Sequence, residues 1–95
     1  MAERTSALLS ALSVALKAQQ GIVTPEDVAQ MVARAQDLLE PGHPGRVAAL
    51  LFAAEWQAHR RDLTALAGLG AQLQHAVIVA TRPDPPGMER RDIHG

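Results

Sequence analysis

The apolar residues between positions 49 and 80 recur in alternating steps of three and four, and the pattern never slips. They are Ala49, Phe52, Trp56, Leu63, Leu66, Gly70, Leu73, Val77 and Ala80, with His59 in the same register. This spacing is typical of a helix that packs along one side. The second half of the chain is therefore predicted to be either one long helix or two helices whose turn keeps the phase.

The polar residues at 59–62, His-Arg-Arg-Asp, favour two helices. The segment before them is apolar on a second side as well, so it requires neighbours on two sides. One helix over 46–80 would also be far longer than the mean of roughly 11–12 residues. We therefore predict a turn at 59–62 in which Asp62 caps a fourth helix. The alternative is three helices, the last of them running through 46–80.

Two more helices are predicted in the first half of the chain. The first covers about 5–20, and its apolar stripe is Leu8, Leu9, Leu12, Ala15 and Leu16. Gly21 follows it at the position of a C-terminal cap. The second covers about 25–40, with Thr24 as the N-cap and Pro25 in the first turn. Its apolar stripe is Val28, Met31, Val32, Ala35, Leu38 and Leu39.

The fold class predicted from these patterns is all-α. The chain holds 18 Ala and 12 Leu among its 95 residues, and both residue types favour helix. We expect a compact antiparallel bundle or a repeat-like array of four helices, at about 5–20, 25–40, 46–59 and 62–80. These helices form one domain over residues 1–81. Residues 82–95 are predicted to be an extended or disordered tail, because three prolines and a glycine lie within 83–87.

The segment Leu-Leu-Glu-Pro-Gly-His-Pro, residues 38–44, is followed by a predicted helix, a polar turn and an Ala/Leu-rich helix. Over residues 38–75 this arrangement resembles the junction and helix pair of tetratricopeptide-type repeats. The chain departs from that pattern because positions 60–61 hold no glycine and most of the large aromatic positions are Ala or Leu. The resemblance implies a protein-binding or chaperone-like scaffold.

The sequence contains no arrangement typical of an enzyme, a cofactor site or a metal site. Glu55, His59 and Asp62 share one side of a helix, but three such ligands without a second His or a Cys make a poor divalent site. Gly-Leu-Gly at 68–70 lies inside a helical pattern and is predicted to allow close helix packing rather than phosphate binding. We expect no catalytic, cofactor-binding or metal-binding residues.

Charge and cysteine content restrict the partners and the compartment. Nine basic and ten acidic residues give a formal net charge of −1, which disfavours nucleic-acid binding. The chain contains no cysteine and no run of eighteen apolar residues, so we expect a cytoplasmic protein without a membrane span. The alternative function is a helical nucleic-acid-binding regulator that uses arginines at 60, 61, 82, 90 and 91.

The leading prediction is a small non-enzymatic protein–protein interaction module, acting as a homodimer, an adaptor or a chaperone-like protein. It rests on apolar residues of the last two helices that exceed what a lone four-helix monomer can bury. The candidate partner-binding residues are Trp56, Leu69, Val77, Ile78 and Val79. Trp56 has a second interpretation as a core anchor. The expected partner is a second copy of the chain, another protein, or both.

Overall fold

The computed structural model describes residues 2–81, and they form four helices without a strand. The helices are α1 (Ala2–Gln20), α2 (Pro25–Leu38), α3 (Pro44–His59) and α4 (Leu63–Thr81). The prediction of an all-α fold with four helices is confirmed. The alternative of one helix over 46–80 is wrong, because the chain turns at residues 60–62. The tail predicted for 82–95 lies outside the described residues.

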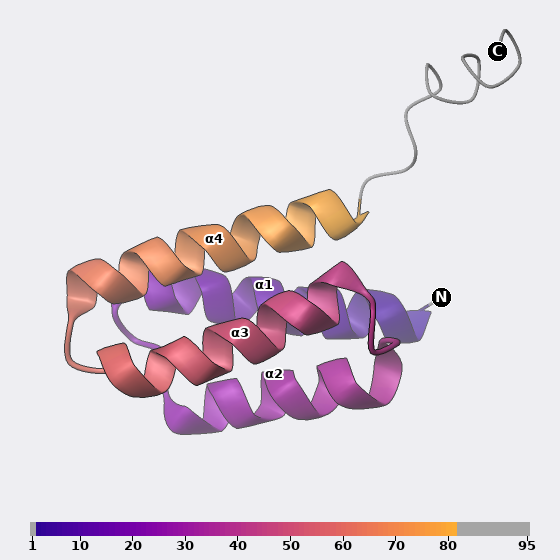
Figure 1. Ribbon diagram of the computed structural model, residues 1–95, viewed down its shortest axis with the longest axis horizontal. Coiled ribbons are helices and arrows are strands. Elements are labelled where there is room, and N and C mark those ends of the chain that lie inside the picture. The colour runs from indigo at the N-terminus through magenta and orange to yellow at the C-terminus, as the bar shows by residue number, and fades with distance from the viewer. Residues whose placement is uncertain (1, 82–95) are drawn as a thin grey trace, which may run out of the picture.

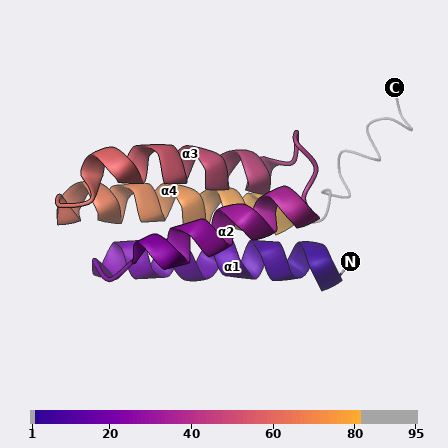
Figure 2. The same ribbon diagram turned by 90° about the horizontal axis from the view of Figure 1, so that it is seen from below.

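The four helices form a closed antiparallel bundle in which each helix packs against the next. Contacts join α1 to α2, α2 to α3 and α3 to α4, and the most extensive contact joins α4 back to α1. In Figure 1, α4 lies along the top and α2 along the bottom, with α1 and α3 between them. Figure 2, seen from below, brings α2 to the front. Helices α2 and α4 therefore occupy opposite edges of the bundle.

Local signals in the sequence set the helix ends. At the start of α2, the Asp27 backbone N–H donates to Thr24 Oγ1 (3.2 Å) and the Thr24 backbone N–H donates to Asp27 Oδ2 (3.0 Å). This reciprocal pair is a capping box. At the end of α1, Gly21 has a φ of 73°, and the Ile22 N–H donates to the Lys17 carbonyl. A left-handed residue at this position favours glycine.

The last two helices begin at caps of their own. His43 Nδ1 accepts a hydrogen bond from the Gly45 N–H (2.9 Å), and Pro44 occupies the first position of α3. Asp62 Oδ1 accepts from the Ala65 N–H (3.0 Å) at the start of α4. The predicted role of Asp62 as a cap is thus confirmed. The cap at His43 starts α3 two residues before the predicted position.

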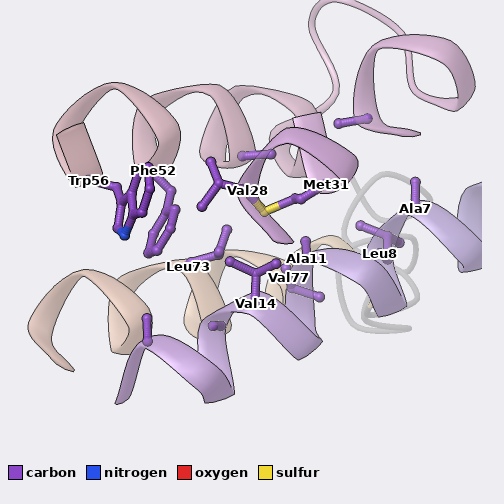
Figure 3. Close-up of a cluster of buried hydrophobic side chains, with 14 of the residues drawn as sticks. Ala7, Leu8, Ala11, Val14, Val28, Met31, Phe52, Trp56, Leu73 and Val77 are labelled. Carbon is purple, nitrogen blue, oxygen red and sulfur yellow. The ribbon is translucent and has the colours of Figure 1, made fainter. Parts of the chain in front are cut away.

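The core is aliphatic and small, apart from two aromatic side chains. Phe52 and Trp56 lie side by side on α3, with Leu73 of α4 facing them (Figure 3). Met31 of α2 is fully buried in the same cluster. The remaining core residues are Ala7, Leu8, Ala11, Val14, Ala15, Ala18, Val28, Ala35, Leu39, Ala49, Leu66 and Val77. Among residues with described side chains, no polar or charged residue is buried.

The contact between α1 and α4 is close enough to exclude a side chain at Gly70. A Cβ atom on that residue would lie 2.5 Å from the carbonyl oxygen of Ala15 and 3.0 Å from the Cβ atom of Ala18. Gly68 differs, because a Cβ atom there would meet nothing within 4 Å. The predicted role of the Gly-Leu-Gly segment in close packing therefore belongs to Gly70 and not to Gly68.

This close contact also explains where the predicted stripe of the first helix was wrong. Leu9 is 59% exposed and Leu16 is 42% exposed, whereas four alanines of α1 are buried. Those alanines are Ala7, Ala11, Ala15 and Ala18. A leucine facing α4 at the level of Gly70 would hold the two helices apart, so the smaller side chains take the inner positions.

The two glycines of α4 give a matched pair of substitutions. We expect Gly70→Ala to lower the free energy of unfolding by about 1–3 kcal/mol, because the backbone oxygen of Ala15 cannot move aside cheaply. We expect Gly68→Ala to raise it by up to about 1 kcal/mol, because alanine favours helix and the position is open. Urea denaturation at a dilute protein concentration measures both changes. Shifts of the same sign would contradict this account of the α1–α4 contact.

Candidate functional site

The polar contacts between helices concentrate on α2 and the residues that follow it. Lys17 Nζ of α1 lies 3.1 Å from Asp27 Oδ1, and Arg34 of α2 donates to Ser6 Oγ (3.2 Å). Arg4 pairs with Glu40 at 2.6 Å just beyond α2. These contacts all connect α1 with the α2 edge of the bundle.

A further side chain secures the other end of α2. The Arg46 guanidinium of α3 donates to the backbone oxygens of Gln36 (3.3 Å) and Leu39 (3.1 Å). The last carbonyls of a helix have no partner within the helix, and a cation at this end complements the helix dipole. Arg46 therefore joins the start of α3 to the end of α2.

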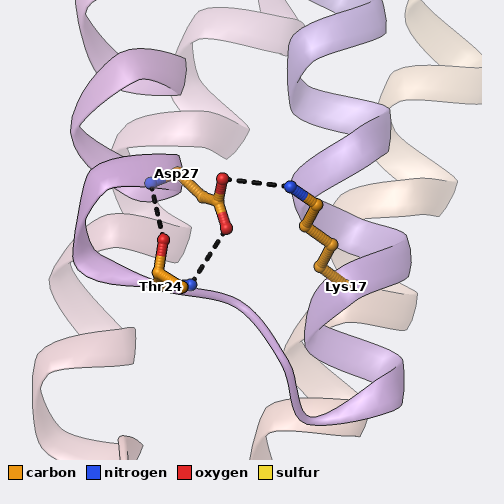
Figure 4. A network of polar contacts seen from close by, with 3 residues as sticks. All are labelled: Lys17, Thr24 and Asp27. Carbon is orange, nitrogen blue, oxygen red and sulfur yellow. Dashed lines mark hydrogen bonds and ion pairs between the residues drawn. The ribbon is translucent and has the colours of Figure 1, made fainter.

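Asp27 is the centre of the largest of these polar clusters (Figure 4). Its carboxylate accepts from the Thr24 backbone N–H and from Lys17, and both bonds lower the pKa of Asp27, the backbone bond most. Bonds that stabilise the charged form of a carboxylate hold it ionised to lower pH. The cluster therefore ties the α1–α2 link to both helices at neutral pH.

Helix α4, on the opposite edge, carries no Asp, Glu, Lys or Arg. A hydrogen bond between side chains joins it to α1, from Gln19 Nε2 to Gln74 Oε1 (2.8 Å). Its mean hydropathy reaches 1.4, and among residues 2–81 it is the one helix that passes for a membrane span by length and composition. Core helices of soluble proteins pass the same test, but most of their residues are buried, whereas only 28% of this segment is buried. Helix α4 packs into this bundle through Leu66, Gly70, Leu73 and Val77.

Large apolar side chains are exposed around α4 and are missing from the outside of α2. Six of them lie on α4 and on the two helices that pack most extensively against it: Leu9, Leu16, Val47, Leu51, Ile78 and Val79. We call these six residues the α4 face. Two more, Ile22 and Leu63, lie at the end of the bundle where Gly21 meets Leu63. On α2, the exposed positions hold Pro25, Glu26, Ala29, Gln30, Ala33, Arg34, Gln36 and Asp37.

Two apolar grooves flank α4. The groove between α3 and α4 has a volume of about 260 Å³, and Leu51, Leu69 and Ala76 contribute to its lining. Glu55 supplies its single charged group. The groove between α1 and α4 has a volume of about 240 Å³ and is lined by Leu9, Leu12 and Ile78 among others. Both grooves open to solvent, so the apolar surface continues from α4 onto each neighbour.

The structure separates the five predicted partner-binding residues. Trp56 and Val77 are each 3% exposed and belong to the core. Leu69 lines the groove beside α3, and Ile78 lines the groove beside α1. Nine residues of helix turn a side chain by about 180°, which places these two on opposite flanks of α4. Val79 is 44% exposed on the outside.

Four residues of the α4 face escaped the sequence analysis as surface candidates. Val47 and Leu51 of α3 belong to the second apolar stripe of that helix, and this stripe was the signal that could have identified them. Leu9 and Leu16 of α1 were predicted to lie in the core. Their spacing of seven residues places them on one side of the helix, but nothing local shows that alanines exclude them from the interior.

The other sequence candidates lie apart from the α4 face. Arg60 and Arg61 are exposed at the turn between α3 and α4, and the Arg60 guanidinium lies 5.5 Å from the centre of the Trp56 ring. Over residues 2–81, no three His, Asp or Glu side chains are grouped so that they could hold a metal ion. The arginines at 82, 90 and 91 lie outside the described residues.

No protein-family model, curated protein or solved structure matches this chain. The resemblance of residues 38–75 to tetratricopeptide-type repeats therefore stays a prediction.

The Asp27 cluster predicts a dependence of stability on pH. A carboxylate whose pKa is lowered by folding stabilises the fold above its unfolded pKa, about 3.9, and this contribution is lost as the pH falls through its folded pKa. We expect Asp27→Asn to lower the free energy of unfolding by about 0.5 kcal/mol at pH 7. The difference from the unsubstituted protein should disappear near pH 2.

Urea denaturation at the two pH values measures this effect. Asp37→Asn is the matched control, because Asp37 is an exposed carboxylate at the other end of α2. A penalty for Asp27→Asn that is equal at pH 7 and pH 2 would show that the charge of Asp27 does not contribute.

Proposed function

We propose that this protein is a non-enzymatic protein–protein interaction module that binds its partner on the α4 face. The observation that carries the proposal is the division of the bundle into two unlike edges. Charged groups and interhelix polar contacts gather at α2, whereas α4 has no charged residue and is bordered by exposed Leu, Ile and Val. Large contiguous apolar patches of this kind mark interaction sites on soluble proteins.

The energetic argument concerns the apolar area that remains in contact with water. The six side chains of the α4 face are 42–62% exposed. Removing apolar surface from water contributes about 25 cal/mol per Å². A partner that covers both flanking grooves gains this contribution without removing an ion from water, except at Glu55. The α2 edge lacks this advantage, because a partner there would desolvate several charged groups.

The test compares one substitution on the α4 face with one on α2. We expect Val79→Glu to abolish association, because it places a carboxylate on the apolar outer surface of α4. Val79 is already exposed, so the helical content should not change. Native mass spectrometry of the full chain, purified gently from the cells that produce it, measures association, and circular dichroism measures helicity.

Ala33→Glu is the matched control, because Ala33 is exposed on α2. The unsubstituted protein and Ala33→Glu should both give a discrete complex, with Val79→Glu giving the chain alone. If the unsubstituted protein also occurs only as a single chain, or if Val79→Glu still associates, the α4 face is not the binding surface.

A further inference from the structure

We infer that the occupant of the α4 face is a second copy of this chain, bound as a symmetric dimer in which the two α4 helices run antiparallel. This inference rests on the proposed function and names its partner. Three properties of α4 support a second copy: its charge, the arrangement of its large and small outer side chains, and the area that it can cover.

The first property is charge. Two identical surfaces meet like against like, so any ionised group near the two-fold axis faces its own copy or its neighbours. Over its 19 residues α4 has no Asp, Glu, Lys or Arg, and its one titratable side chain is the exposed His75. Glu55 is the one charged residue lining either groove, and it lies on the flank toward α3, not on the outer side of α4. Two α4 helices can therefore meet without repulsion between carboxylates or between ammonium groups.

The second property is the distribution of side-chain size along the outside of α4. Its first half presents small residues, Thr64, Gly68 and Ala71, all of which are exposed. From Gln72 onward it presents larger residues, Gln72, His75, Ile78 and Val79, all of which are exposed. An antiparallel pair sets the small half of one helix against the large half of the other. A parallel pair would leave a gap at one end and crowd the other.

Gly68 shows this complementarity most directly. A Cβ atom at Gly68 would meet nothing within 4 Å, so no packing inside the bundle requires a glycine there. Glycine in an exposed helix interior is destabilising by about 1 kcal/mol relative to alanine. In the antiparallel pair, with the two-fold axis near Ala71, Gly68 faces the second half of the partner helix. A larger residue at this position would hold the two helices apart.

The third property is area. At 1.5 Å per residue, α4 is about 28 Å long. Together with the adjoining sides of α1 and α3, it presents a strip about two helix diameters, or about 20 Å, wide. Its flat projection is about 560 Å², the same order as the roughly 800 Å² of accessible surface that each partner buries in a stable complex. The two grooves add area beyond the flat projection.

The absence of cysteine from this chain allows a direct test, because each introduced cysteine is unique. Three variants of the full chain each carry one cysteine and are treated with a short bismaleimide: Ala71→Cys, Thr64→Cys and Val79→Cys. The antiparallel dimer predicts that Ala71→Cys crosslinks to itself. The Thr64→Cys variant and the Val79→Cys variant should each give no crosslink on its own. A mixture of the two variants should give a crosslink between one chain of each. Ala33→Cys on α2 is the control and should not crosslink.

Sedimentation equilibrium of the purified full chain gives the second readout. The unsubstituted chain should reach twice the monomer mass. Gly68→Gln should raise the dimer dissociation constant by about tenfold or more, because a bulky side chain enters the contact. The same substitution should raise the urea midpoint of the dilute monomer. A purely structural role for Gly68 would not give these opposite effects.

Three results would overturn the inference that the partner is a second copy or that the two α4 helices run antiparallel. They are a monomer at every concentration, a dimer that does not crosslink through α4, and self-crosslinking of both Thr64→Cys and Val79→Cys, which indicates parallel helices. Native mass spectrometry from the source cells separates this failure from failure of the proposed function. A complex with a different protein that Val79→Glu abolishes would retain the interaction function and reject the dimer. The absence of any complex would reject both.

Discussion

The close contact between Gly70 of α4 and the backbone of Ala15 in α1 is the constraint on which the bundle depends. With no side chain at Gly70, the fourth helix can lie against the first and close the ring. The contact determines which residues of α1 face inward, since alanine is small enough to leave the helices in contact at this level. The bundle is thus closed by small residues, and Phe52, Trp56 and Met31 fill the space nearer to α2 and α3.

The same contact accounts for much of the apolar surface. Because alanines occupy the inner positions of α1, Leu9 and Leu16 are exposed, and Leu9 lines a groove shared with α4. On α3, Leu51 lines the groove shared with α4, and Val47 is exposed on the same helix. The exposure of Leu9 and Leu16 is therefore a consequence of how tightly α1 and α4 pack.

The helix ends and the spacing of the apolar residues could be predicted from the sequence. Which of these apolar residues are buried and which are exposed could not be predicted in every helix. Thr24, Gly21 and Asp62 are local signals, and the structure uses each of them as a cap. The residues that recur in steps of three and four from Ala49 to Val77 keep this spacing through the turn, and most of them are buried. In α1, a hydrophobicity pattern ranks leucine above alanine for the core. It does not record that a neighbouring helix approaches through a glycine fifty-five residues away in the chain. Leu9 and Leu16 were missed as surface candidates for the same reason.

The contacts that hold the fold and the surface that we propose binds a partner lie at different edges of the bundle. The capping box, the Lys17–Asp27 pair and the Arg46 contacts hold α1, α2 and α3 together at the α2 edge, where a partner would have to remove charged groups from water. Few polar contacts tie α4 to its neighbours, and its outer surface consists of Gly, Ala, Thr, Ile and Val together with Gln72 and His75. A change on the outside of α4 therefore alters little that holds the fold. Under the proposed function, this separation would let substitutions on the α4 face change the affinity for a partner without destabilising the chain.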